Sequence, residues 1–203
     1  MKKSKFSVSA DGLLRQNIVL MSGLVTAPVI VAATSVERAA VLVVSFFLIS
    51  YTSILLCRFI PRKIVYTVRI LLYAVVAAVM YIPTALCIAK LFPNVSSGVM
   101  LYVELLVVNS FLLAKTETRF YLKPYGEMVL DAFIYVIGYA VVAFLVGVLR
   151  EVLAYGTVCG FHLCEPVVPA AKSPFFGFIL VGIMAAVCRG ISGKRAPRKE
   201  RGV

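Results

Sequence analysis

The stretch Lys90-Leu-Phe-Pro-Asn-Val-Ser-Ser-Gly-Val-Met-Leu-Tyr-Val-Glu104-Leu-Leu-Val-Val-Asn109-Ser110-Phe-Leu-Leu-Ala-Lys115 decides the fold. It is apolar enough to enter a lipid bilayer, yet its centre carries a carboxylate, an amide and a hydroxyl on adjacent turns. Hydrocarbon tolerates such groups only where they face a protein interior, a partner or a transport pathway. We therefore expect an interrupted membrane segment whose polar groups have a function.

The rest of the chain has the same membrane character. Its 203 residues are 62% hydrophobic with a mean hydropathy of +0.99, which is too much apolar surface for one soluble domain to bury. The run 132–149 would form a helix about 27 Å long, close to the roughly 30 Å thickness of the hydrocarbon core. The sequence predicts an all-α polytopic membrane protein with a single domain, 1–203, and six transmembrane helices. Their uncharged or nearly uncharged runs are 16–36, 39–57, 70–89, 91–114, 132–149 and 173–188.

The net charge of +12 is better explained by membrane orientation than by nucleic-acid binding. If all six segments cross from a cytoplasmic N-terminus, only Arg38, Lys90, Arg150 and Lys172 of the 21 Lys and Arg residues lie outside. Re-entrant first and fourth segments would give a weaker positive-inside bias, so full crossing is favoured. The basic tail 193–203 is typical of an anchor near anionic headgroups. We expect a prokaryotic cytoplasmic (inner) membrane location with both termini cytoplasmic, lipid contacts and no nucleic-acid partner.

One layout occurs in both halves of the chain, about 12–90 and 91–192. Each half has an interrupted segment followed by two plainer spans, and the first interruption contains Ala27-Pro28. Proline removes a backbone donor, so we expect a break near Ala27, although a simple kink is equally compatible. Three crossings in each half would invert the second half relative to the first. Interrupted segments at matching positions of inverted repeats indicate a midplane site, here lined by Ala27, Pro28, Glu104, Asn109 and Ser110.

The charged residues and cysteines elsewhere in the chain are weaker evidence for a functional site. Arg150 and Glu151 are adjacent, so they cannot face each other on a helix and each needs its own partner. Structural anchoring is the simpler role for this charge pair, and a place in a charge pathway is the alternative. The loop 156–173 contains Cys159, His162 and Cys164, which are too few ligands for a tetrahedral metal site; a local disulfide stays open. We expect no metal and no catalytic residue, because no nucleophile–base pair and no glycine-rich phosphate loop is present.

Several short stretches resemble one known family: Gly12-Leu-Leu-Arg-Gln-Asn17, Ala27-Pro28 through Thr34-Ser35, Val108-Asn109-Ser110 with Lys115-Thr-Glu117, Leu130-Asp131, and Leu149-Arg150-Glu151 through Gly156-Thr157. They look like the integral membrane subunits of the Rnf and Nqr ion-translocating electron-transport complexes, and most like the subunit called E in Rnf and D in Nqr. The resemblance implies a homologous membrane partner of opposite orientation, of the Rnf A / Nqr E type. It also implies flavin and iron–sulfur subunits in the same complex.

The family resemblance further implies an intramembrane [2Fe–2S] cluster between the two homologous subunits, with two cysteines from each. One cysteine precedes the proline of the first segment, and the other follows the asparagine of the fourth. The corresponding residues here are Ala27 and Ser110, so both thiolates are missing. Alanine has no lone pair, and a serine hydroxyl is a poor substitute for a thiolate. We expect this chain alone to bind no cofactor, with the cluster absent or supplied by a partner.

Two functions are compatible with these residues. The first is a non-catalytic membrane subunit of an Rnf/Nqr-like redox-driven ion-translocating complex, contributing scaffold and an ion or electron path between ferredoxin- or NADH-linked partners. Glu104, Asn109 and Ser110 would then supply oxygen ligands or a protonatable site for the moving cation. The alternative is the substrate-binding membrane component of a small-solute, vitamin-type transporter. The chain has no aromatic and polar external loop that could cap a solute, and the family stretches favour the first function.

Overall fold

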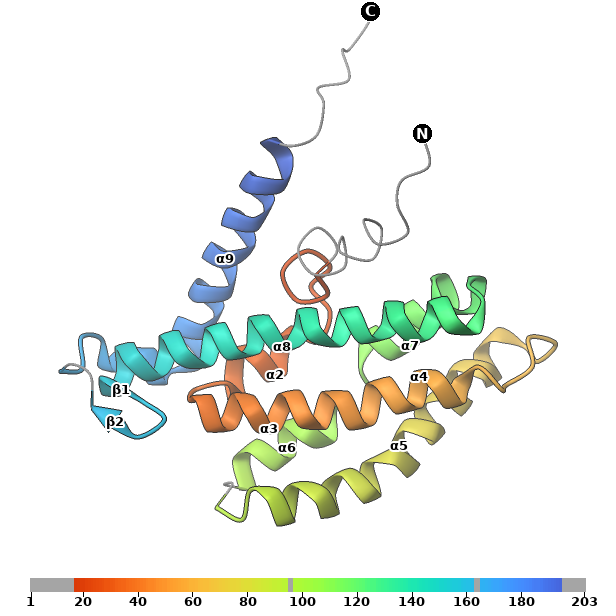
Figure 1. Cartoon of the computed structure of the whole chain (residues 1–203), viewed down its shortest axis with the longest axis horizontal. Coiled ribbons are helices and arrows are strands. Elements are labelled where there is room, and N and C mark those ends of the chain that lie inside the picture. The colour runs from red at the N-terminus through yellow and green to blue at the C-terminus, as the bar shows by residue number, and fades with distance from the viewer. Residues whose placement is uncertain (1–16, 95–96, 163–164, 195–203) are drawn as a thin grey trace, which may run out of the picture.

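The computed structural model describes residues 17–94, 97–162 and 165–194, and helices dominate it (Figure 1). The helices are α2 (Thr26–Ala32), α3 (Val36–Phe46), the π-helical turn η1 (Phe47–Tyr51), α4 (Thr52–Cys57), α5 (Tyr66–Leu91), α6 (Ser97–Leu105), α7 (Ser110–Thr118), α8 (Tyr125–Tyr155) and α9 (Pro174–Lys194). Two 3-10 turns, η2 (Phe120–Leu122) and η3 (Pro169–Lys172), and a hairpin of β1 (Thr157–Val158) and β2 (Phe161–His162) complete the described elements. The helical class is confirmed, and the short hairpin lies in the loop expected at 156–173.

The described helices include four stretches long and apolar enough to cross a membrane: Val36–Cys57, Tyr66–Leu91, Gly98–Leu122 and Tyr125–Tyr155. α9 contributes a shorter apolar stretch, Pro174–Gly190, and the first apolar run contains only the seven-residue α2. These helices confirm the polytopic membrane class, while six full crossings stay a prediction. The residues before 17 and nearly all of the basic tail lie outside the described residues.

The break in the first segment lies slightly before the position expected from Ala27. Gly23 and Val25 have positive φ angles of 66° and 56°, and α2 begins directly afterwards at Thr26. Pro28 therefore lies in the first turn of α2, where its missing N–H removes no helical hydrogen bond. A left-handed conformation costs a β-branched residue such as Val25 about 1–2 kcal/mol. Since Val25 is only 8% exposed, packing around it offsets this cost.

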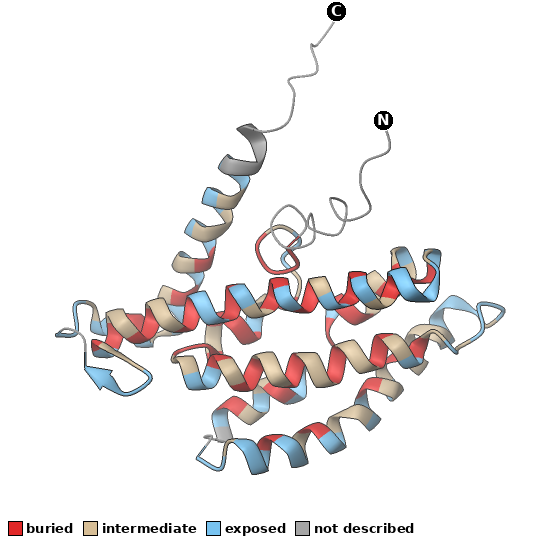
Figure 2. Cartoon of the chain, viewed as in Figure 1, coloured by how far each residue is buried: buried red, intermediate tan, exposed pale blue. Residues whose placement is uncertain are grey.

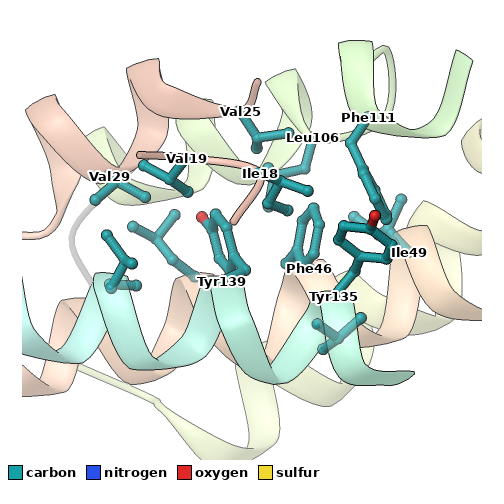
Figure 3. Packing of buried hydrophobic residues seen from close by; sticks show 14 of the residues in the cluster. Ile18, Val19, Val25, Val29, Phe46, Ile49, Leu106, Phe111, Tyr135 and Tyr139 are labelled. Carbon is teal, nitrogen blue, oxygen red and sulfur yellow. The ribbon is translucent and has the colours of Figure 1, made fainter. Parts of the chain in front are cut away.

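The core lies where α3 and α8 pack side by side, with the start of α7 against them (Figures 1 and 2). Small residues allow this close approach: a Cβ added to Gly147 would lie 2.9 Å from both the Ala39 Cβ atom and the Ser35 carbonyl oxygen. Phe46 stacks on Tyr139 with ring centroids 4.1 Å apart, and it contacts Phe111 at 5.5 Å (Figure 3). This aromatic cluster joins α3, α7 and α8, so the helix that follows the second break is anchored in the core.

The outward faces of the bundle are apolar. Along α5, Leu71, Val75, Val79, Ile82 and Leu86 are all more than half exposed, which is the pattern of a helix facing lipid or another membrane subunit. Figure 2 shows exposed residues, in pale blue, along both α5 and α9. Buried polar residues such as Asn109, Arg150 and Glu151 lie inside this shell of apolar helices.

Candidate functional site

A pocket of about 280 Å³ lies where the two interrupted segments meet. One wall comes from the turn before α2 and its first residues, and the other comes from the end of α6 and the start of α7. Ala27, Pro28, Asn109 and Ser110, which the sequence placed at a common midplane site, all line this pocket. The complete lining is Gly23, Val25, Thr26, Ala27, Pro28, Leu105, Val108, Asn109 and Ser110.

Asn109 fixes the break between α6 and α7. Its side-chain oxygen accepts a hydrogen bond from the Leu112 N–H at 2.7 Å, which caps the N-terminus of α7. Its Nδ2 donates to the Ser50 Oγ at 2.9 Å and to the Leu106 carbonyl oxygen at 2.5 Å. Asn109 is 4% exposed, so these partners replace water almost completely. One amide therefore caps α7, pairs with the preceding turn and ties the break to η1.

Glu104 is placed differently from the other candidates. It is not among the residues that line the pocket, and it lies on the exposed surface of α6. The Tyr81 hydroxyl on α5 donates to the Glu104 Oε1 at 3.2 Å. A helix turns about 100° per residue, so Glu104 projects away from the neighbouring Leu105, which does line the pocket. The sequence placed Glu104 in the same segment as the lining residues but could not give its rotation about the helix.

The donor atoms around the pocket do not fit an iron–sulfur cluster. The described lining contains no sulfur, and the two positions that correspond to cluster ligands are Ala27 and Ser110. The free cysteines among the described residues are Cys57, Cys87, Cys159 and Cys188, and none of them lines the pocket. Because such clusters are normally held by thiolates, the residues present do not form half of a [2Fe–2S] site.

Arg150 lies at the opposite end of α2 from the pocket and is fully buried. Its guanidinium donates to the carbonyl oxygens of Ile30 (2.6 Å), Ala171 (3.0 Å), Ser173 (3.1 Å), Lys172 (3.2 Å) and Ala33 (3.5 Å). These carbonyls belong to the C-terminal end of α2 and to the η3 segment that leads into α9. Arg150 therefore joins α2, α8 and α9 at one point, and the expectation that it needs a partner separate from Glu151 is confirmed.

Glu151 stabilises the next connection along the chain. Its Oε2 accepts from the Val36 N–H at 2.7 Å, at the N-terminus of α3, where a carboxylate suits the helix dipole. Its Oε1 accepts from the Thr157 hydroxyl at 3.5 Å. Close packing completes this corner, since a Cβ on Gly177 would lie 2.4 Å from the Ile30 carbonyl oxygen and 3.3 Å from the Arg150 Nη1. Arg150 and Glu151 thus bind the two ends of the α2–α3 connection.

Sequence reasoning missed two ion-pair clusters at the other end of the bundle. The Glu117 carboxylate accepts from the Arg69 Nε at 2.6 Å and Nη2 at 2.8 Å, and the Tyr73 hydroxyl also donates to it. Asp131 pairs with the Arg119 Nε at 2.6 Å and the Lys123 Nζ at 2.8 Å. The sequence did contain a signal for these ion pairs: acidic and basic residues occur together near the ends of neighbouring predicted segments.

The loop after α8 gives no support for a metal centre. No group of three or more His, Cys, Asp or Glu side chains with metal-binding geometry occurs within the described part of the chain. His162 lies on the exposed strand β2, and Cys159 is free. Cys164 lies outside the described residues, so the possible pairing of Cys159 with Cys164 stays a prediction.

The fold and the pocket define a polytopic helical membrane protein with two broken segments facing one site. A family model described as "Rnf-Nqr subunit, membrane protein" matches residues 5–192, so the chain belongs to the Rnf-Nqr family. Among curated proteins, it is similar to the D subunit of the Na(+)-translocating NADH-quinone reductase of Chlamydia pneumoniae. The two are 24% identical over 188 residues, which cover 90% of this chain and 86% of the relative. The expected family resemblance is confirmed.

Proposed function

We propose that this chain is a membrane subunit of a redox-driven ion-translocating complex of the Rnf/Nqr type. The family match covers residues 5–192, nearly the whole chain, and the similar curated protein is named as a subunit of a Na(+)-translocating NADH-quinone reductase. The observation that carries the proposal is the pocket in which the break before α2 meets the break between α6 and α7. Broken helices that meet inside a membrane protein are typical of ion and substrate sites.

Within the complex, we assign this subunit a scaffold and ion-path role. The pocket offers the Asn109 amide and the hydroxyls of Thr26 and Ser110, which are oxygen-containing groups suited to a hard cation such as Na⁺ or to a proton carried on water. Glu104, which lies outside the pocket on the exposed face of α6 and accepts from the Tyr81 hydroxyl, is a separate candidate for a cation or proton site. Electrons pass through partner subunits in this proposal, since neither Ala27 nor Ser110 supplies a thiolate.

The proposed partners are a homologous membrane subunit of opposite orientation together with flavin and iron–sulfur subunits. The apolar faces of α5 and α9 offer surface for lipid and for such membrane neighbours. A multi-pass location in a prokaryotic inner membrane, with both termini cytoplasmic, agrees with the distribution of Lys and Arg along the sequence.

The proposal is tested by purifying the complex through an affinity tag on this chain in a mild detergent. Mass spectrometry should identify a homologous membrane subunit with flavin and iron–sulfur proteins, and the reconstituted complex should couple electron transfer to cation movement. Co-purification of a pair of ATPase subunits in their place would favour the small-solute transporter and contradict the proposal.

A further inference from the structure

The contact of η1 and α4 with α7 and the residues that flank it runs from the pocket toward the cluster around Glu117. At its pocket end, the Asn109 Nδ2 donates to the Ser50 Oγ at 2.9 Å. At its other end, the Tyr121 hydroxyl donates to the Cys57 carbonyl oxygen at 2.7 Å. Because residue numbers increase from the first contact to the second on both sides, α4 and α7 run in the same direction along this contact.

Two more hydroxyls lie between these two contacts. Ser53, at the start of α4, follows Ser50 of η1 by three residues, and Thr116 of α7 follows the N-cap Asn109 by seven, spacings that bring each residue to roughly the same side of its segment as the earlier one. We call Ser50, Ser53, Asn109 and Thr116 the α4–α7 seam. Ser53 is 0% exposed and Thr116 is 2% exposed. Neither hydroxyl has a hydrogen-bond partner among the described residues.

Unpaired buried hydroxyls are unusual in a helical protein. A Ser or Thr in a helix commonly donates to the carbonyl oxygen four residues earlier. Ser45 does so with Val41 at 2.7 Å, and Thr84 does so with Met80 at 2.7 Å. Ser53 and Thr116 make no such bond, so each hydroxyl has an unused donor and acceptor. Nearly all buried polar groups in proteins are paired, which favours a water molecule or a cation as the partner of each hydroxyl.

The seam connects two polar regions. Asn109 belongs to the pocket lining, and Glu117 directly follows Thr116 in the sequence. Ser50 lies in the π-helical turn η1, and such turns frequently occur at functional sites. The seam residues are uncharged, so they can hold a small cation without trapping it, which conduction requires.

We propose that the α4–α7 seam conducts a small cation, either Na⁺ or a proton carried on water, between the pocket and the Glu117 cluster. The inference rests on the proposed function, because electron transfer elsewhere in the complex must drive the ion. Neutral oxygen ligands at Ser50, Ser53 and Thr116 would replace part of the hydration shell of the cation as it passes.

The test uses the purified whole complex in proteoliposomes and measures cations moved per electron transferred. Ser53→Ala and Thr116→Val should each lower this ratio at least fivefold, while Thr116→Ser should keep at least half of it. The matched controls are Ser45→Ala and Thr84→Val, which remove buried hydroxyls already bonded within their own helices and should leave the ratio unchanged. Measuring ²²Na⁺ uptake and internal acidification in parallel identifies the ion.

A second measurement tests access without depending on transport. Ser53→Cys should react with a small water-soluble cationic thiol reagent faster than the buried native Cys57, at least tenfold, in the assembled complex. If the seam is dry packing, Ser53→Ala and Thr116→Val will raise the melting temperature and leave the ion ratio intact, and the introduced thiol will stay unmodified. That result would contradict cation conduction along the α4–α7 seam. A wild-type complex that transfers electrons without moving any cation would instead overturn the proposed function.

Discussion

Replacing Arg150 by methionine tests whether this side chain holds α2 in place. Methionine fills a similar volume but donates no hydrogen bond, so the substitution removes the common partner of the carbonyl oxygens of Ile30, Ala171, Lys172 and Ser173. The carbonyl end of α2 would then be buried without a donor. The expected consequence is a loose α2 and, at its other end, a disordered wall of the pocket.

The magnitude follows from the geometry. Hydrogen bonds from a charged donor contribute about 1.5–3 kcal/mol each. Four of the Arg150 bonds are 3.2 Å or shorter, so their gross contribution is about 6 kcal/mol at the lower value. Relief of the guanidinium's desolvation returns part of this, which leaves a net loss of about 3 kcal/mol in the free energy of unfolding. For a chain of this size, the melting temperature should fall by about 6–12 °C.

The assay heats the detergent-solubilised complex and follows the remaining folded fraction by fluorescence-detected gel filtration. Lys63→Met is the matched control, because Lys63 is exposed and its loss should change the melting temperature by less than about 2 °C. Arg150→Lys should lie between wild type and Arg150→Met, since one ammonium group cannot reach all four carbonyls. An Arg150→Met complex that melts with the wild type would show that the clamp does not stabilise α2.

Three further predictions concern Gly177, Asn109 and Glu104. Gly177→Ala should destabilise the fold by about 1–3 kcal/mol, because its Cβ would lie 2.4 Å from the Ile30 carbonyl oxygen. The control Gly182→Ala, on the same helix, meets nothing within 4 Å and should be neutral or stabilising by up to about 1 kcal/mol. Thermal melting distinguishes the two variants, and equal melting temperatures would contradict the packing. Asn109→Ala should cost about 2–3 kcal/mol, since it removes the cap of α7 and leaves the Ser50 hydroxyl without its donor, and a denaturation series that shows no loss would refute that role. Glu104→Gln should reduce cation transport more than electron transfer, and an unchanged ratio of the two would remove Glu104 from the ion path.

The interruptions were the most predictable part of the structure. Pro28 in an apolar run and Asn109-Ser110 in another are local signals, because each interferes with helix hydrogen bonding or competes for it wherever it occurs. The positions of both helix breaks along the sequence were therefore predicted to within a few residues. Their meeting at one pocket was predictable from the repeated layout of the two halves, and the structure places Ala27 and Ser110 in the same lining.

The unpredicted features depend on rotation and on distant partners. The position of Glu104 opposite Tyr81 reflects the angle of α6 about its axis, which hydropathy does not specify when the whole segment is apolar. The ion pair of Arg69 with Glu117 joins residues 48 positions apart, so only the three-dimensional fold brings them together. The left-handed Val25 was equally hidden, since a β-branched residue gives no sequence signal for that conformation.

The central claim, that the two broken segments meet at one pocket, is tested most directly by cross-linking the double variant Ala27→Cys/Ser110→Cys in the assembled complex with a short bismaleimide. Both positions are exposed in the pocket, so peptide mass spectrometry should find residues 27 and 110 joined in the double variant and in neither single variant. If both introduced thiols react with the reagent but never with each other through it, the breaks lie apart and the account is contradicted.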